Sequence, residues 1–333
     1  MFRIKPPSPR DTRVHFHDWL ADGATPAPSL AEALKPGLAA SPRRIAPRHF
    51  YDHRGSALFD LICQQPEYYP TRTEQRILER ASADIAACVG SDSALIELGS
   101  GASRKIRLLL DALRPARYVG LDISRTFLLE STQCLANDYP WLEVHALCAD
   151  FTAPFELPPL PPAARPVLFF PGSSIGNFSP EEARALLSRL GAPLPRGAGL
   201  LIGVDRIKDR TRLEAAYNDA QGITGAFNLN LIERLRREAG AAVAPRDFEH
   251  LAFYNDEAAR IEMHLVSRCD QRFRLDDRLI ALKRGERIHT ENSWKYTPEG
   301  FIHLAQEAGF AARAHWSDEE ALFSVHYMEW RAP

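Results

Sequence analysis

Cysteine is scarce in this 333-residue sequence, and the five cysteines that occur are scattered along it. No two of them form the Cys-x-x-Cys spacing that is typical of zinc sites and redox motifs. We therefore expect neither a metal centre nor a disulfide framework, and the reducing cytoplasm is the expected location. The five positions are Cys63, Cys88, Cys134, Cys148 and Cys269.

Long apolar runs are also missing. No segment approaches the roughly 20 apolar residues that are needed to cross a bilayer. The amino terminus has Pro6, Pro7 and Pro9 between Arg3 and Arg10, so it lacks the apolar core of a signal peptide. The sequence therefore predicts neither a membrane span nor secretion.

The chain has no excess of charge of either sign. Its 41 Lys and Arg residues nearly balance 43 Asp and Glu, which leaves a net charge of -2. Such a surface has no general positive field to attract nucleic acid or an anionic membrane. With 45% hydrophobic residues, the composition is ordinary for a folded protein of one large or two moderate domains. We expect a monomer that binds small molecules.

What the sequence does have is an alternation of strands and helices between residues 94 and 204. The apolar runs are predicted to be strands, and the stretches with helical spacing between them are predicted to be helices. The strands are apolar on both faces, which is typical of a parallel sheet covered by helices. The predicted strands are 94–98, 118–121, 144–148, 167–170 and 200–204, and the predicted helices are 106–113, 127–135 and 180–190.

This alternation stops after Asp205. Residues 208–240 are predicted to be helical, and residues 248–254, 261–267 and 272–282 alternate like antiparallel strands. A last helix, 298–308, begins with a proline in its first turn and ends before Gly309; strands 311–316 and 323–330 follow it. The first forty residues, rich in Pro, Ala and Ser, are expected to lie loosely on the surface. We infer a sheet domain that an inserted segment interrupts.

A glycine-rich turn follows the first strand, in the string Glu97-Leu98-Gly99-Ser100-Gly101. Glycines there allow a sharp turn and the close approach of a ligand. A dinucleotide fingerprint would need a third glycine where Arg104 stands, which disfavours a nicotinamide dehydrogenase. S-adenosylmethionine has no phosphate, and its amino-acid part requires hydrogen-bond donors and acceptors instead.

Acidic residues end the next two strands. Asp122 stands where a carboxylate can accept both ribose hydroxyls. Asp150 could accept the adenine amino group, and Phe151 could cover the ring. An acid at a strand end is commonly a helix cap. Three such signals at the carboxyl ends of successive strands, where parallel sheets bind ligands, favour a nucleoside cofactor.

Several longer strings of this sequence are distinctive. They are residues 50–60, 66–72, 97–101, 171–178, 226–230, 261–263 and 290–293. These strings resemble one known family, the histidine-specific Nα-methyltransferases of ergothioneine biosynthesis, which also includes fungal enzymes that methylate tryptophan derivatives. The resemblance begins at about residue 45 and continues in order to the end of the chain.

The resemblance implies an α/β fold: a class I S-adenosylmethionine-dependent methyltransferase with a Rossmann-like sheet and a second, α+β substrate domain. Residues 73–207 and 296–333 would form the methyltransferase domain. Residues 14–72 and 208–295, the amino-terminal segment and the insertion, would form the substrate domain. Both co-substrates would be small molecules, S-adenosylmethionine and an amino acid, without a metal.

The resemblance also assigns site residues. Contacts with S-adenosylmethionine are expected from Gly99, Gly101, Lys105, Asp122, Asp150 and Phe151. The α-amino and carboxylate groups of the substrate would be held by Tyr51, Gly172, Asn177 and Tyr217, with Tyr51 and Asn177 as the catalytic pair. The substrate side chain would meet Tyr68, Met263, Glu291 and Ser293.

The chemistry of these residues favours histidine. Glu291 and Ser293 stand two apart on a predicted strand, so both face one side, and together they can address two imidazole nitrogens. A buried carboxylate against an indole ring would be left unpaired. A purely structural role remains open for three of these residues: Tyr68 as a core aromatic, Met263 as an apolar residue that fills a gap in the core, and Glu291 as a surface acid. His250 and His264 are expected to be surface or packing residues, and His289 and Trp294 are left unassigned.

Two alternatives remain. One is an Nα-methyltransferase of tryptophan or another aromatic amino acid. The other is a catalytically silent protein that binds S-adenosylmethionine, although such a protein would have no chemical reason to keep Tyr51, Asn177 and Tyr217.

Overall fold

The computed structural model describes residues 14–20, 28–90 and 92–331. The prolines near the amino terminus fall outside these residues. The expectation that the first forty residues lie loosely on the surface is wrong for the part that is described, because residues 14–18 form a strand and residues 30–39 form a helix that buries Ala31, Leu34 and Leu38. Within the described part of the chain, no helix is both long and apolar enough to cross a membrane.

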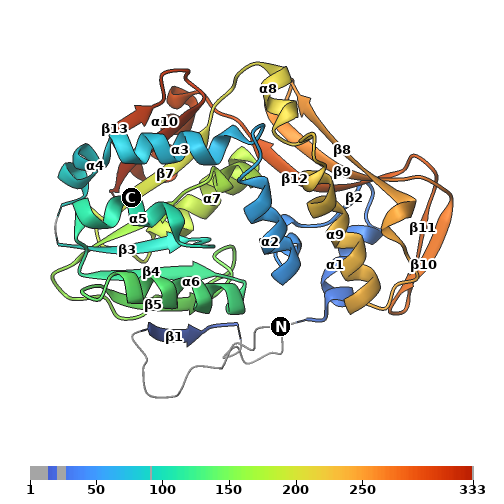
Figure 1. Ribbon diagram of the computed structural model, residues 1–333, viewed down its shortest axis with the longest axis horizontal. Coiled ribbons are helices and arrows are strands. Elements are labelled where there is room, and N and C mark those ends of the chain that lie inside the picture. Colours follow the sequence, from blue (N-terminus) through green and yellow to red (C-terminus); the bar gives the residue numbers. More distant parts are fainter. Residues whose placement is uncertain (1–13, 21–27, 91, 332–333) are drawn as a thin grey trace.

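An eight-stranded sheet forms the larger part of the molecule (Figure 1). Its strand order is β1-β5-β4-β3-β6-β7-β14-β13, parallel from β1 to β7 and antiparallel at β14 and β13. This arrangement confirms the predicted Rossmann-like fold. The strands are β1 (Val14–Asp18), β3 (Ser93–Leu98), β4 (Arg117–Asp122), β5 (Glu143–Cys148), β6 (Arg165–Phe170), β7 (Gly199–Asp205), β13 (Phe310–Ser317) and β14 (Phe323–Trp330).

Helices cover both faces of this sheet. On one face α3 (Tyr69–Arg80), α4 (Ser82–Val89), α5 (Arg104–Leu113) and α6 (Arg125–Asp138) share an apolar core with the strands. On the other face, α7 (Pro180–Gly191) and α10 (Pro298–Glu307) do so. The apolar spacing explains the packing, because each apolar residue that predicted α5 is buried.

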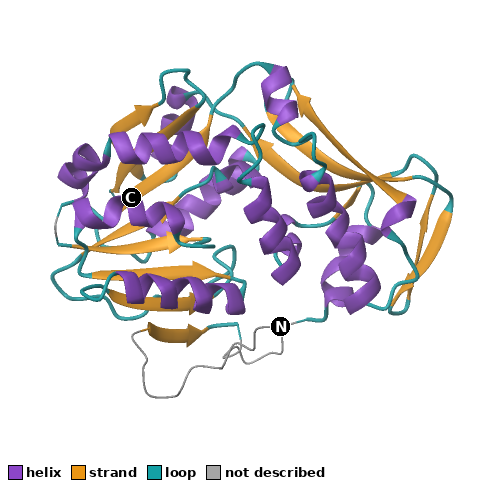
Figure 2. Cartoon of the chain, in the orientation of Figure 1, coloured by secondary structure: helices purple, strands orange, loops and turns teal. Residues whose placement is uncertain are grey.

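The smaller part contains a four-stranded sheet in the order β2-β12-β9-β8 and a separate hairpin, on the right in Figures 1 and 2. Its own apolar core joins these strands to the helices that pack on them. The strands are β2 (Arg43–Arg44), β8 (Phe248–Asn255), β9 (Arg260–Ser267), β10 (Gln271–Leu275), β11 (Arg278–Leu282) and β12 (Arg287–Trp294). The helices are α1 (Leu30–Ala39), α2 (His53–Ile62), α8 (Arg210–Ala215) and α9 (Ile223–Glu238), and short 3-10 turns are η1 (Pro47–Phe50), η2 (Ser174–Asn177) and η3 (Pro245–Asp247).

Three details differ from the sequence-based expectations. Residues 272–282 are a hairpin rather than one strand, because the chain reverses at Asp276, whose φ is 52°. Residues 208–240 form two helices, separated by residues 216–222, and Gly222, whose φ is 71°, directly precedes the second helix. Strand β1 pairs in parallel with β5, so residues 14–18 belong to the larger sheet and not to the smaller part to which the range 14–72 assigned them.

Candidate functional site

The loops after β3 and β4 meet at Asp122. The Gly101 amide donates to one carboxylate oxygen of Asp122 over 3.0 Å, and the Ser124 amide donates to the other over 2.9 Å. Gly99 and Gly101 have φ values of 67° and 50°, which favour glycine. Asp122 therefore holds both loops at the carboxyl edge of the sheet, while its own loop enters α6.

The first loop lies close to the ring of Phe151. A Cβ atom added to Gly99 would project toward the Phe151 ring, 3.9 Å from its Cε1 atom, and it would meet nothing closer. Phe151 packs edge-on against Phe170, at 5.3 Å between ring centroids. Gly99 and the half-buried Phe151 ring are thus neighbours at the edge of the sheet where adenine is expected.

Asp150 is hydrogen-bonded within its own turn. One of its carboxylate oxygens accepts from the amide and the hydroxyl of Thr152 at 2.8 and 2.5 Å. The other lies 3.7 Å from the guanidinium of Arg48, a neighbour that the sequence analysis did not anticipate.

Lys105 lies closer to the proposed substrate residues than its assignment to the cofactor suggested. Its ammonium group is 2.6 Å from a carboxylate oxygen of Glu74, which is fully buried in α3. The same carboxylate accepts the Gly172 amide over 2.9 Å. A Cβ atom on Gly172 would lie 3.2 Å from the Lys105 nitrogen, so Lys105 and Gly172 are neighbours. Glu74 was missed because only the tertiary structure shows that its helix face is buried.

Three tyrosines lie near Glu291 of β12: Tyr51 precedes α2, Tyr68 precedes α3, and Tyr217 follows α8. Tyr68 and Tyr217 contact each other edge-on, at 6.2 Å between ring centroids. Burial raises the pKa of Tyr51 and Tyr68 well above the usual value, and the charge of Glu291 adds to both shifts. The two phenols are therefore neutral at physiological pH and can hydrogen-bond without adding charge.

Strand β12 carries Glu291 and Ser293 on one face, as the alternation of side chains along a strand requires. Met263 on β9 stands directly opposite Glu291 in the antiparallel register. Burial raises the pKa of Glu291 to about 7, and the opposing effect of nearby Lys295 limits the shift. Trp294 points to the other face, where it packs against the core of the larger sheet, so it supports the site from behind.

Asn177 ends the turn η2, which lies against β12. A Cβ atom on Gly176 would be 2.8 Å from the carbonyl oxygen of Trp294 and 3.5 Å from the Ser293 hydroxyl. Only glycine permits this close approach. It brings η2, and with it Asn177, against the strand that carries Ser293.

Several polar side chains in this cluster have no hydrogen-bond partner among the described residues. They are the Tyr51 and Tyr68 hydroxyls, the Asn177 amide and the Glu291 carboxylate, all of them buried or half-buried. None of these polar atoms is fully enclosed by protein, so each can still reach water or a bound molecule. Their concentration in one place indicates a binding site for a small polar ligand.

A buried network supports the cluster from one side. The Tyr217 hydroxyl donates to Ser293 over 2.8 Å, and the Lys295 ammonium donates to the same Ser293 oxygen over 2.8 Å. Lys295 also pairs with Asp205 at 2.6 Å, at the end of β7. Asp205 is paired with Lys208 as well and accepts the Tyr69 hydroxyl, so Tyr69 is a core residue.

Lys295 was not anticipated from the sequence. Glu291, Ser293 and Lys295 nevertheless stand at i, i+2 and i+4, so the alternation that linked the first two could have pointed to the third.

The three histidines near the site are hydrogen-bonded to neighbouring residues. His250 accepts from Asn228 over 2.9 Å and donates through its other nitrogen to the Tyr217 carbonyl over 2.9 Å. His264 contacts Glu262 over 3.1 Å, and His289 contacts Asn292 over 2.8 Å. They support strands and the Tyr217 backbone, and none of the three is placed as a free base.

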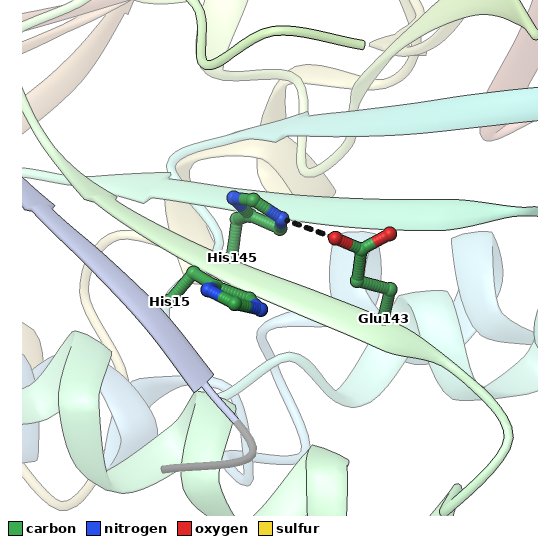
Figure 3. A group of neighbouring side chains, drawn as sticks. All are labelled: His15, Glu143 and His145. Atoms are coloured by element: carbon green, nitrogen blue, oxygen red, sulfur yellow. Dashed lines mark hydrogen bonds and ion pairs between the residues drawn. The ribbon is translucent and has the colours of Figure 1, made fainter. Parts of the chain in front are cut away.

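A group of metal-ligand type lies on β1 and β5, shown in Figure 3. Ligand atoms of His15, Glu143 and His145 lie within 4.8 Å of one another. The Glu143 carboxylate already accepts from the Arg117 guanidinium over 2.7 Å and from His145 over 3.1 Å. The fixed positive charge of Arg117 disfavours a cation here, and we interpret the group as a polar contact that joins β1 to β5.

The sheet order and the glycine loop define a class I S-adenosylmethionine-dependent methyltransferase. The model of the histidine-specific, S-adenosylmethionine-dependent methyltransferase family matches residues 30–330. The chain belongs to this family.

Individual relatives agree with this membership. The chain is 41% identical to a histidine N-alpha-methyltransferase of Mycolicibacterium smegmatis, over 90% of this chain and 95% of that protein. It is 37% identical to the Mycobacterium tuberculosis enzyme of the same name, over 89% and 94%. A 4-dimethylallyltryptophan N-methyltransferase of Epichloe festucae var. lolii is 28% identical, over 89% and 93%.

Proposed function

We propose that this protein methylates the α-amino group of free L-histidine three times, giving histidine betaine, the methylation step of ergothioneine biosynthesis. The observation that carries this proposal is the cluster of polar side chains without partners, which combines Glu291 with Tyr51, Tyr68 and Asn177. The two relatives with 41% and 37% identity, both named histidine N-alpha-methyltransferases, support the choice of substrate.

We assign the two parts of the molecule different tasks. The larger sheet, with Gly99, Gly101, Asp122, Asp150 and Phe151 at its carboxyl edge, holds S-adenosylmethionine. Residues 28–72 and 208–295 hold the amino acid, together with Gly172 and Asn177, which follow β6 of the larger sheet. Lys105, through its contact with Glu74 beside Gly172, stands where these two sites adjoin.

S-adenosylmethionine supplies an electrophilic methyl group when bound. The residues of this chain align the amine with it, since alignment alone accounts for a large share of such rate enhancements. The amine must be neutral to react. Tyr51 and Asn177 orient it through a neutral phenol and a neutral amide, which do not stabilise the ammonium form as a carboxylate would. The proton released leaves through water.

Repeated transfer requires room for a growing amine. Gly172 carries no side chain, so it adds no bulk beside the amine. We therefore expect the second and third methyl groups to be accepted as well.

The alternative substrate, tryptophan or a related aromatic amino acid, is favoured by one observation, the relative that methylates 4-dimethylallyltryptophan. Glu291 argues against it, because an indole has a single N–H and would leave the Ser293 hydroxyl unmatched.

The deciding experiment is a mass-spectrometric assay of the purified protein with S-adenosylmethionine and each of the twenty amino acids. A gain of three methyl groups on histidine alone supports the proposal. Methylation of tryptophan contradicts the assignment of the substrate, and a product that stays at one methyl group contradicts trimethylation. Binding of S-adenosylmethionine without any methylated product would identify a silent homologue. A monomer in the cytoplasm stays a prediction, and light scattering checks the oligomeric state.

A further inference from the structure

Lys295 is a buried cation next to the proposed substrate site, and the proposed function gives it no task. Its side chain has no exposed surface. Taking an ammonium group out of water is costly unless it is well paired. The partner, Asp205, also pairs with Lys208 at 2.6 Å, so the three charged groups together retain a net positive charge.

The three hydrogens of this ammonium group each face an acceptor. One meets Asp205 at 2.6 Å, one meets the Ser293 hydroxyl oxygen at 2.8 Å, and a longer contact of 3.4 Å reaches the Tyr217 hydroxyl. Asp205 lies at the end of β7 and Lys295 directly after β12. The ion pair therefore joins the larger sheet to the smaller one beside the site.

These contacts limit what Ser293 can do. A serine hydroxyl has two lone pairs and one hydrogen. Lys295 donates to the Ser293 oxygen, and so does the Tyr217 hydroxyl over 2.8 Å. Both lone pairs are thus used, and the Tyr217 oxygen, which sends its own hydrogen to Ser293 and already receives the Lys295 ammonium, does not accept from Ser293 while Lys295 is present. Only the O–H of Ser293 remains for a ligand.

We propose that Lys295 is a positioning residue that makes Ser293 a hydrogen-bond donor only, so that the site selects a neutral ring with one acceptor nitrogen and one N–H. The acceptor nitrogen faces Ser293, and the N–H faces the Glu291 carboxylate, which has no other hydrogen-bond partner in the described parts of the chain. Neutral imidazole satisfies both positions. An imidazolium ring has no acceptor for Ser293, and neither has an indole ring. This inference rests on the proposed function.

The first test is the form of bound histidine. Ring-labelled 15N-histidine is bound to the wild-type protein together with S-adenosylhomocysteine, and the nitrogen chemical shifts are recorded. We expect one protonated and one unprotonated ring nitrogen at a pH at which free histidine is half protonated. Two protonated ring nitrogens would overturn the inference and leave histidine methylation itself intact.

The second test uses Lys295→Met with Lys208→Met as its matched control. Both lysines are buried and both lie 2.6 Å from Asp205, but only Lys295 contacts Ser293. The readout is the ratio of kcat/KM for histidine to kcat/KM for each isomer of β-pyrrolylalanine, which keeps one N–H and lacks the acceptor nitrogen.

In the wild type we expect this ratio to be about 100, because the pyrrole ring leaves the buried Ser293 hydrogen without an acceptor. In Lys295→Met the ratio falls to about 10 or less, since Ser293 can then turn its hydrogen to the Tyr217 hydroxyl. The loss for histidine lies mainly in KM. Lys208→Met keeps the wild-type ratio.

An unchanged ratio in Lys295→Met, or an equal fall in both variants, contradicts the inference. If Lys295→Met does not fold, the 15N measurement on the wild type still decides. Failure of this inference and failure of the proposed function give different results. A wild-type protein that does not methylate histidine contradicts the proposed function rather than the role of Lys295.

Discussion

The carboxyl edge of the larger sheet and the face of β12 both present acids to a ligand site, yet they prepare them differently. Asp122 accepts two backbone amides, and Asp150 accepts from Thr152. Glu291 has no hydrogen-bond partner among the described residues, and burial raises its pKa to about 7. The acids at the cofactor edge hold the loops in shape before any ligand binds, whereas the acid at the substrate site is held only by its strand.

This difference shows how the position of each acid is determined. The Ser124 and Thr152 amides bind Asp122 and Asp150 within their own turns, so this part of each position is encoded locally. An unpaired acid on a strand depends on neighbours from other elements for its position, its pKa and its protonation. Substitution of a residue that is held by intramolecular partners should therefore change stability, whereas substitution of an unpaired residue at the substrate site should change kinetic constants.

Glu74→Ala should have the largest effect on stability. It removes the buried carboxylate that accepts the Gly172 amide and pairs with Lys105, and it leaves both groups unpaired. We expect a loss of about 3 to 5 kcal/mol in the free energy of unfolding, measured by denaturant titration. Glu74→Gln, which can still accept one hydrogen bond, should lose less. Equal losses in the two variants would argue against the role of the charge.

Asn177→Ala should lower activity without lowering stability, because its side chain has no intramolecular partner within the described chain. We expect kcat to fall about 100-fold through poorer alignment of the amine, with an unchanged melting temperature. The matched control is Asn255→Ala, which removes a hydrogen bond of 2.9 Å to Glu262. The control should lower the melting temperature and affect kcat little. A reversed pattern would contradict the placement of Asn177.

Glu291→Gln should raise the KM for histidine about 10-fold, through the loss of a charge-assisted hydrogen bond, and leave the binding of S-adenosylmethionine unchanged. The pH dependence sharpens this test. Burial raises the Glu291 pKa to about 7, so the carboxylate that accepts the ring N–H forms only as the pH rises through that value. The KM of the wild type should fall over this range.

The fall in KM should become shallower in Glu291→Gln, where only the substrate still titrates. Parallel profiles of KM against pH in the two proteins would mean that the carboxylate does not meet the substrate ring.

The smallest effect concerns His326, in the core of the larger sheet. Burial, together with His315 and Arg206, lowers its pKa from 6.5 to about 3. The folded state therefore favours neutral His326. The resulting stability is fully present above pH 6.5 and is lost as the pH falls toward 3. Between pH 7.5 and 6 we expect a loss of about 1 kcal/mol, measured by thermal or denaturant unfolding. His326→Gln should flatten this dependence, and an unchanged slope would contradict it.

Much of the larger sheet could be predicted from the sequence. Each predicted strand from 94–98 to 200–204 lies inside or matches an observed strand, and 127–135 and 180–190 lie inside α6 and α7. Apolar runs and helical spacing are local signals, and burial on one or both faces enforces them. The smaller part was predicted less well, because a turn such as that at Asp276 depends on a conformation that Asp shares with few residues and carries little sequence signal.

The sequence by itself determined the glycine turns, the acids at the strand ends, and the common face of Glu291 and Ser293, because each follows from local backbone geometry. Only the tertiary structure decided that β1 joins β5, that Glu74 reaches Gly172, and that Lys295 meets Asp205 beside Ser293. These contacts join residues far apart in the chain. A buried charge requires a partner, but the sequence does not say which one; only the packing of the two sheets against each other brings the partners within reach.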